Sequence, residues 1–126
     1  MKFTPIDPPR VFGVGHDQAI RLKDCGRVYL DSDEQVTFVT EGGGEYDVVR
    51  KPWGFYATPS LNRRLPQFGF RAALIKSPDG RYYLFLIERD KEPEFKRYRK
   101  KENLSLVAWL DSDEALKAFE SKAGHA

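Results

Sequence analysis

The feature that most constrains the fold is a pair of apolar segments joined by a four-residue turn. Residues 70–76 (Phe-Arg-Ala-Ala-Leu-Ile-Lys) and 81–88 (Arg-Tyr-Tyr-Leu-Phe-Leu-Ile-Glu) flank Ser77-Pro-Asp-Gly80. Proline presets φ at the second turn position, aspartate can bond its own backbone, and glycine accepts a positive φ. The segments therefore predict an antiparallel hairpin. Because both are apolar on both faces, we expect two central strands that are covered on each side.

Other short segments also have the composition of strands. Apolar and charged residues alternate from Ile20 to Leu30, which predicts a hairpin with its turn at Asp24-Cys-Gly26. β-Branched and aromatic residues predict further strands at residues 11–15, 35–41, 45–50, 53–58 and 104–110.

Two helices are expected near the C-terminus. The first covers residues 91–102 and has Pro93 near its first turn, where a missing backbone N–H costs nothing. The second begins at Asp111, because Asp111 and Glu114 have the spacing of a capping box. Its apolar stripe consists of Ala115, Leu116 and Phe119.

These elements predict an α+β fold that is mainly β. We expect a twisted antiparallel sheet, curled into a small barrel or two-layer roll, with two helices near the C-terminus. The length of 126 residues suits a single domain over residues 1–126. Three prolines predict an extended Pro-rich arm at residues 1–10, and residues 122–126 are expected to form a mobile tail.

Charge and cysteine content narrow the functional classes. The net charge of +2 is too balanced to indicate nucleic acid as a partner on charge alone. The single Cys25 excludes an internal disulfide framework and fits a reducing compartment. No secretory signal precedes the domain, and no run of about 18 apolar residues predicts a membrane span. The sequence thus predicts a cytoplasmic protein without a membrane partner.

The sequence predicts no metal ligand, catalytic residue or cofactor. His16 and His125 have no second histidine or cysteine at the spacing of a zinc site. Leu-Asp-Ser-Asp-Glu occurs at residues 30–34 and 110–114, but neither copy has the glycine that a calcium loop needs at its sixth position. Capping of a turn or a helix explains both copies more simply.

A glycine-rich turn at residues 41–45 (Glu-Gly-Gly-Gly-Glu) joins two of the expected strands. Its flanking carboxylates would repel phosphate, so a hairpin turn is favoured over a phosphate loop. The stretch from Val36 to Val49 is similar to cupins, in which a Glu-Gly-x-Gly turn joins two strands of a β-roll. The resemblance covers Glu41 to Gly44 with the flanking strands. It implies a β-roll without metal chemistry, because the metal-binding histidines and glutamate of active cupins are missing.

Residues 51–64 are dense in aromatic, hydroxyl and basic side chains. Flat apolar faces beside hydroxyls and amides suit a sugar, and adjacent guanidiniums suit phosphate or carboxylate. The expected ligand-binding residues are Trp53, Tyr56, Thr58, Ser60, Asn62, Arg63 and Arg64. In the competing interpretation, Trp53 and Phe55 fill the core and an ordinary Pro-Ser-Asn turn follows.

We therefore expect a non-catalytic binding or accessory domain. It would engage a sugar-like or anionic small ligand, or a protein partner, near residues 53–64. One alternative is a metal-free enzyme acting on an activated sugar or similar polar metabolite, with Tyr56, Asp47 or Glu45 as acid or base. A second is a nucleic-acid-binding module that uses the basic residues 96–101, although acidic neighbours favour a solvated helix. Exposed edge strands also leave room for a homodimer.

Overall fold

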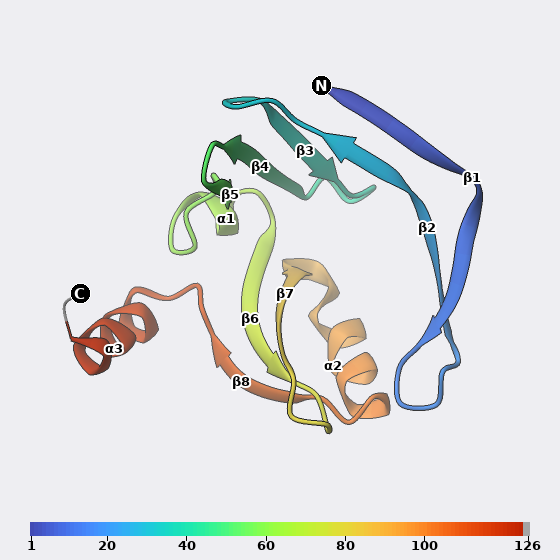
Figure 1. Ribbon diagram of the computed structural model, residues 1–126. Helices are drawn as coiled ribbons and strands as arrows, with labels where there is room; N and C mark the ends of the chain where they lie inside the picture. Colours follow the sequence, from blue (N-terminus) through green and yellow to red (C-terminus); the bar gives the residue numbers. More distant parts are fainter. Residues whose placement is uncertain (125–126) are drawn as a thin grey trace. The chain divides into compact units, whose positions relative to one another are not determined.

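The computed structural model describes residues 1–124, which are 47% strand and 23% helix (Figure 1). This confirms the α+β class, mainly β, with helices near the C-terminus. His125 and the end of the expected mobile tail lie outside the described residues. The elements are β1 (Lys2–Val14), β2 (Ile20–Tyr29), β3 (Gln35–Val39), β4 (Glu45–Lys51), β5 (Gly54–Ala57), α1 (Arg64–Gln67), β6 (Phe70–Lys76), β7 (Tyr82–Glu88), η1 (Arg89–Lys91), α2 (Glu92–Lys101), β8 (Ser105–Trp109) and α3 (Asp113–Ala123).

The strands form three small sheets, with the orders β1-β2, β3-β4-β5 and β7-β6-β8. Within residues 1–124 no sheet closes into a barrel. The expected single curled sheet is therefore replaced by three short ones. No helix formed by the described residues is both long and apolar enough to cross a membrane.

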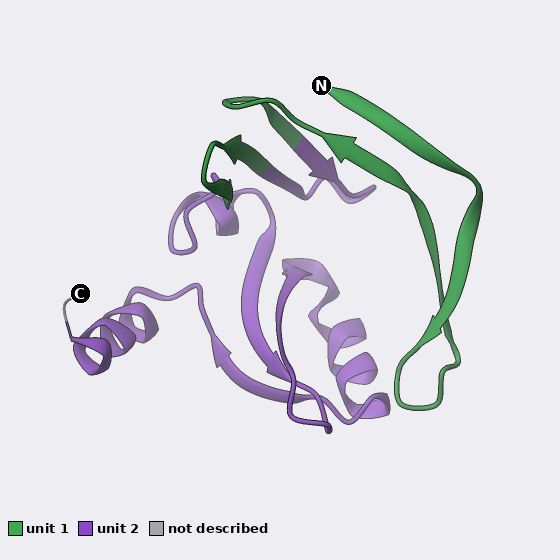
Figure 2. Cartoon of the chain, in the orientation of Figure 1, with its two compact units in different colours: residues 1–36, 48–56 green, residues 37–47, 57–126 purple. Residues whose placement is uncertain are grey.

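The chain divides into two compact units (Figure 2). Unit 1 comprises residues 1–36 and 48–56, and unit 2 comprises residues 37–47 and those from Ala57 onward. Each unit is described by itself below, and the expected single domain stays a prediction.

Unit 1 is dominated by the β1–β2 hairpin. The strands are antiparallel, from Lys2 opposite Tyr29 to Val14 opposite Ile20, with a register shift between Pro5 and Arg10. The expected arm at residues 1–10 thus lies in extended backbone that pairs with β2 from Lys2 onward.

The predicted turn at Asp24-Cys-Gly26 is wrong, because β2 runs through it without a break. Gly26 serves packing instead: a Cβ atom there would lie 2.6 Å from Cζ of Phe3. The chain reverses before β2, where the backbone N–H of Gln18 donates to the carbonyl of Gly15 at 3.2 Å. Gly26 therefore marks a close approach of two strands and not a turn.

Unit 2 contains the hairpin that the sequence predicts best. β6 and β7 pair from Phe70 opposite Glu88 to Lys76 opposite Tyr82. In the turn, the N–H of Gly80 donates to the carbonyl of Ser77 at 3.0 Å, and Gly80 has a φ of 85°. The hairpin at residues 70–88 is confirmed to within one residue.

The core lies on both faces of β6, the central strand of its sheet. On one face Ala72 packs with Leu65 of α1, and both are fully buried. On the other face Ala73 and Ile75 pack against Phe95 of α2. The buried residues of the two clusters are Leu65, Phe70 and Ala72, and Ala73, Ile75 and Ile87.

The expectation that both hairpin strands are covered is wrong for β7. This strand is at the edge of the sheet, and Tyr82 and Leu84 are 58% and 56% exposed. α1 has only four residues and covers the β6 face near Leu65, so the turn end of the sheet is left open.

Both C-terminal helices are present. α2 has Pro93 at its start, as expected. α3 is capped by Ser112, whose Oγ accepts a hydrogen bond from the N–H of Ala115 at 3.1 Å. The predicted cap at Asp111 is wrong, because the carboxylate of Asp111 is bound by Arg71.

Candidate ligand-binding site

The boundary between the units falls within the predicted ligand segment. Trp53 and Tyr56 belong to unit 1, whereas Thr58 to Arg64 belong to unit 2. The two groups are therefore treated as separate surfaces.

The aromatic group stands on the β4–β5 hairpin of unit 1. Pro52 and Trp53 form the turn, and Gly54 then adopts a φ of 149°, which a side chain would disfavour. Trp53 is 70% exposed and Phe55 is 59% exposed. The interpretation in which Trp53 and Phe55 fill the core is therefore wrong.

Trp53 and Tyr56 form one aromatic surface, which we call the ring platform. Their ring centroids are 6.1 Å apart and their planes differ by 22°, an offset stacked arrangement. Tyr56 is 45% exposed. Water thus reaches two nearly parallel rings that hold each other in place.

Charged groups lie beside the ring platform. The ammonium of Lys51 donates to the carboxylate of Asp33. This hydrogen bond and the charge of Asp33 raise the pKa of Lys51, and the nearby Tyr56 contributes to the same shift. Because Lys51 retains other N–H groups and Asp33 is 71% exposed at its side chain, both can contact a ligand on the rings.

Phe55 is directed to the opposite face of β5 from Tyr56, because successive strand residues alternate. The guanidinium of Arg50 lies over its ring, 5.6 Å from the centroid. Phe55 is therefore an exposed aromatic residue of the same strand that lies outside the ring platform, and it can serve as a control for substitutions of Trp53 and Tyr56.

The polar loop of unit 2 folds on itself through Ser60. The hydroxyl of Ser60 accepts from the N–H of Arg64 at 3.0 Å, and its carbonyl accepts from Leu65 at 2.9 Å. Arg63 is the residue before α1. Ser60 thus accepts hydrogen bonds from the first two N–H groups of the short helix α1, which the sequence did not predict.

Two other loop side chains, Asn62 and Arg64, also have partners within unit 2. Asn62 donates its amide to Asp113 at 2.6 Å, and this bond is the main reason that the pKa of Asp113 is lowered. The guanidinium of Arg64 lies 4.9 Å from the ring centroid of Phe68. Thr58 keeps a buried hydroxyl oxygen without a hydrogen-bond partner. Ser60, Asn62 and Arg64 therefore serve local structure.

The three residues proposed as acid or base in the enzyme alternative differ in burial and do not all belong to the same unit. Asp47 is 8% exposed and accepts the hydroxyl of Thr37. Glu45 is exposed, and its N–H donates to the carbonyl of Phe68 at 3.2 Å. Tyr56 belongs to the ring platform of unit 1. Asp47 thus has a structural role in unit 2.

The basic residues 96–101 form the second half of α2, where all but Arg99 are exposed. Tyr98 is 41% exposed, and desolvation followed by the charge of Glu102 raises its pKa. The helical placement agrees with the expected solvated helix.

The sequence did not reveal an ion-pair cluster around Arg71. Its guanidinium lies 3.7 Å above the ring centroid of Trp109, and Nε donates to Asp111 at 2.7 Å. Nη1 donates to Glu92 at 3.1 Å. These bonds raise the pKa of Arg71, with Asp111 as the largest cause. The only signal in the sequence is a lone arginine within an apolar strand.

This cluster borders a polar hollow of about 470 Å³ that also contacts Pro66 and Arg89. Arg71 is already bound by two carboxylates there. The carboxylates balance the charges of the two arginines, so the hollow offers little net attraction to an ion.

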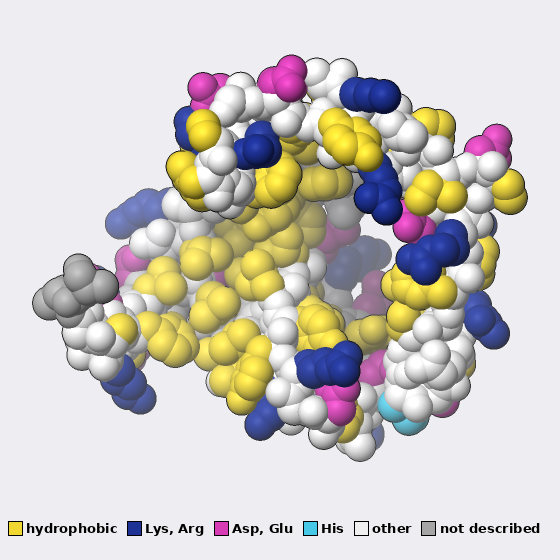
Figure 3. All heavy atoms as spheres, in the orientation of Figure 1, with side chains coloured by type: hydrophobic (Ala, Val, Ile, Leu, Met, Phe, Trp, Pro, Cys, Tyr) yellow, Lys and Arg dark blue, Asp and Glu magenta, His cyan; other side chains and the backbone are white. Residues whose placement is uncertain are grey.

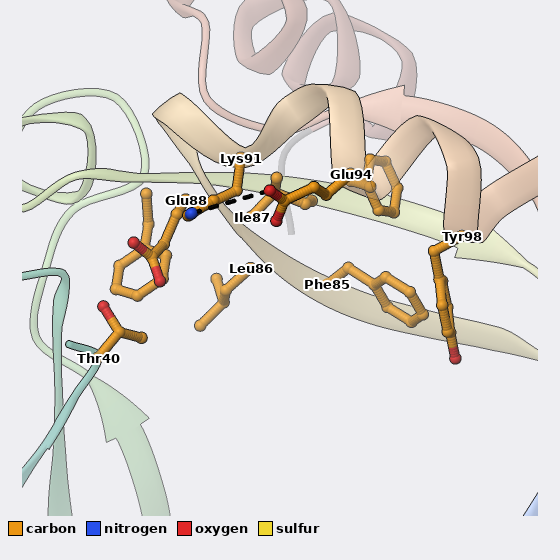
Figure 4. A pocket seen from close by; sticks show the side chains of 10 residues that line it. Thr40, Phe85, Leu86, Ile87, Glu88, Lys91, Glu94 and Tyr98 are labelled. Atoms are coloured by element: carbon orange, nitrogen blue, oxygen red, sulfur yellow. Dashed lines mark ion pairs between the residues drawn. The ribbon is translucent and has the colours of Figure 1, made fainter. Parts of the chain in front are cut away.

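A second hollow, of about 350 Å³, lies between β7 and α2 (Figure 4). Its apolar wall includes Phe85, Leu86 and Phe95, and the Lys91–Glu94 ion pair lies at its rim. Because the Phe85 and Phe95 rings pack edge to face at 6.0 Å, this wall is part of the core.

No family model matches this chain, and no curated protein or solved structure matches it either. The similarity to cupins at residues 36–49 is thus without support from these comparisons.

Proposed function

We propose that this chain is a non-catalytic binding module and that its ring platform receives the flat face of a sugar-like ligand. The observation that carries the proposal is the exposure of two stacked rings, Trp53 and Tyr56, beside the Lys51–Asp33 ion pair. We also propose the reducing cytoplasm as its location, with which the free, exposed Cys25 is compatible.

The chemistry of the ring platform matches that of a pyranose ring. A sugar has an apolar face of C–H groups that packs on an aromatic face, and hydroxyls around its rim that need hydrogen bonds. Lys51 supplies donors and Asp33 supplies acceptors at the edge of the rings. An aromatic side chain contributes large contact area at little cost in side-chain entropy.

The openness of the surface indicates what class of sugar is suitable. The ring platform stands on a hairpin, with Trp53 in the turn, so the contact is shallow. A shallow contact buries little area and binds a single sugar weakly. An oligosaccharide, which can also contact neighbouring residues, is therefore favoured over a monosaccharide.

The experiment is an NMR titration with neutral, N-acetylated and acidic pyranosides and their short oligomers. The chain has two tryptophans, Trp53 and Trp109, so a Trp53→Phe variant assigns the two indole N–H signals. We expect the Trp53 signal to shift with ligand, whereas the Trp109 signal, beneath Arg71, stays in place.

Matched variants distinguish the proposed surface from its neighbours. Trp53→Ala or Tyr56→Ala should weaken binding about tenfold or more, since each removes a stacked ring. Phe55→Ala and the double variant Arg63→Ala/Arg64→Ala should bind as well as the unmodified chain. Binding that is lost in the arginine variant but retained in Trp53→Ala would refute the ring platform and move the site to the loop.

A protein partner on unit 1 is the second candidate. None of residues 1–36 and 48–56 is buried, and large apolar side chains stand exposed along the β1–β2 hairpin. They are Phe3, Val11, Leu22, Val28 and Tyr29. Exposed apolar side chains in this density are typical of interaction surfaces. A partner on this surface would respond to Tyr29→Ala as well as to Trp53→Ala, whereas a sugar would respond to the second alone.

A further inference from the structure

Helix α3 has an apolar stripe that its own chain does not bury. Leu116 and Phe119 lie on one side of the helix, yet no residue of α3 is buried and Phe119 is 45% exposed. The printed hydrogen bonds of the helix lie near its start, where Ser112 caps it and Asp113 accepts from Asn62. An amphipathic helix is stabilised mainly by packing of its apolar side, so this side lacks a partner.

The β7-β6-β8 sheet has an open apolar face in the same unit. Leu74 of β6 lies opposite Leu84 of β7, and Lys76 opposite Tyr82, so these side chains share one face. Burial decreases along this face, from Ala72 at 0% exposed to Leu84 at 56%. Figure 3 shows hydrophobic side chains gathered over β6 and β8 next to α3. The opposite face is covered by α2 through Phe95.

A short, anchored connection leads from β8 into the helix of the same chain. Only residues 110–112 separate β8 from α3. The N–H of Leu110 donates to the carbonyl of Ala72 at 2.8 Å, and Asp111 is clamped by Arg71. These contacts fix the point at which the chain enters α3, at the end of β8.

We propose that two copies of this chain form a symmetric dimer in which α3 of each copy covers the open β7-β6-β8 face of the other. Each copy presents a helix that lacks a sheet and a sheet face that lacks a helix, and a two-fold axis satisfies both at once. The dimer is independent of the sugar-like ligand, because none of these residues belongs to the ring platform.

Dimensions and charge fit this pairing. α3 has 11 residues, so it is about 16 Å long, and a seven-residue strand such as β7 is about 23 Å long. A stable interface buries about 1,200 Å² in total, and a symmetric dimer makes this contact twice, so each contact needs about half of that area. Glu120 and Lys122 flank the apolar stripe of α3 on its two sides, and Lys76 lies on the sheet face, so charge favours the orientation that brings Glu120 to Lys76.

The first test is the mass in solution, measured by light scattering and sedimentation over a range of concentrations. We expect a dimer, whose dissociation constant rises about tenfold or more in Leu84→Glu and in Phe119→Glu. Both side chains are exposed in the single chain, so the variants should keep the circular dichroism of the fold. Phe38→Glu, which is equally exposed but lies elsewhere in unit 2, should leave the dimer unchanged. A monomeric unmodified chain at every concentration would overturn the proposal.

Charge reversal tests the orientation. Lys76→Glu and Glu120→Lys should each weaken the dimer, and the double variant should restore it. A double variant that is weaker than both single variants would contradict the predicted pairing of Lys76 with Glu120.

A disulfide experiment identifies the copy that supplies the helix. In a Cys25→Ser background, Leu84→Cys and Phe119→Cys chains are mixed and oxidised. We expect the mixed dimer to cross-link faster than either variant alone. In the doubly substituted chain we expect linked dimers. A monomer with an internal disulfide would show that α3 covers its own sheet and would refute the second copy.

Discussion

The two units of this chain use their apolar residues in opposite ways. Unit 2 buries Leu65, Ala72 and Ile75 completely, on the two faces of one central strand. Unit 1 buries none of its residues, although it carries Trp53, Tyr29 and other large apolar side chains. Burial of apolar area is the main term that stabilises a fold. The difference indicates that unit 2 carries the stability of the molecule, while the apolar residues of unit 1 are available for ligands.

The largest expected contrast comes from the same substitution made in each unit. Leu65→Ala, at a side chain with no exposure, should lower the free energy of unfolding by about 3 kcal/mol. Leu22→Ala, at a side chain that is 43% exposed, should lower it by less than about 1 kcal/mol. Urea denaturation of both variants measures the difference. Equal losses would show that the two units do not differ in stability as we infer.

The second-largest loss of unfolding free energy is expected at the ion-pair cluster of unit 2, around Arg71. Arg71→Ala leaves the carboxylate of Asp111, 8% exposed at its side chain, without its partner and should cost about 3 kcal/mol. Arg71→Lys keeps the charge but loses the two-pronged contact and the flat stacking on Trp109, and should cost about half as much. Trp109 fluorescence in a Trp53→Phe background reports the unfolding. A lysine variant as stable as the unmodified chain would mean that charge alone matters at this position.

In unit 1 the most sensitive position is expected at a contact between strands. Gly26→Ala would place a Cβ atom 2.7 Å from the carbonyl oxygen of Thr4, so β1 and β2 must separate locally at a cost of about 1–2 kcal/mol. The amide signals of the hairpin should shift in NMR spectra, while those of β6 do not. If β6 signals shifted as strongly, the units would be more tightly coupled than their internal packing indicates.

The smallest effect concerns the pH dependence at the start of α3. The hydrogen bond from Asn62 lowers the pKa of Asp113 in the folded chain. This group therefore stabilises the fold above its unfolded pKa, about 3.9, and that stabilisation is lost as the pH falls through the lower folded value. In Asn62→Ala the pKa of Asp113 should rise, which NMR titration of the carboxyl carbon detects. An unchanged titration would assign the shift to Arg63 and Lys117.

Local chemistry explains which elements the sequence could predict. The β6–β7 hairpin depends on Pro78, Asp79 and Gly80, whose turn preferences act within four residues. α2 likewise depends on Pro93 at its start. In contrast, Gly26 lies within a strand and packs against Phe3, which is 23 positions away and belongs to another strand. A turn signal and a packing glycine are indistinguishable without knowledge of the partner strand.

The candidate site was predictable in composition but not in arrangement. The sequence singled out the aromatic and hydroxyl residues of the 51–64 segment as one group, whereas the structure divides them between two units. Whether Trp53 is buried depends on which strands cover β5, which the segment alone does not reveal. The Arg71 cluster joins residues that are 40 positions apart, so no local pattern reveals it. No local pattern shows either that Arg71 binds the carboxylate of Asp111. Ser112, and not Asp111, therefore caps α3.

The guanidinium of Arg71 has a consequence for how the molecule opens. It belongs to β6, stacks on β8, and binds both the first residue of α2 and the residue that precedes the cap of α3. β8, the start of α2 and the segment that leads into α3 therefore cannot separate from β6 without losing a contact with this one side chain. Transient opening events, as detected by amide hydrogen exchange, should therefore occur in all of them together and not one at a time. Arg71 thus couples segments that are distant in the sequence into one cooperative exchange unit.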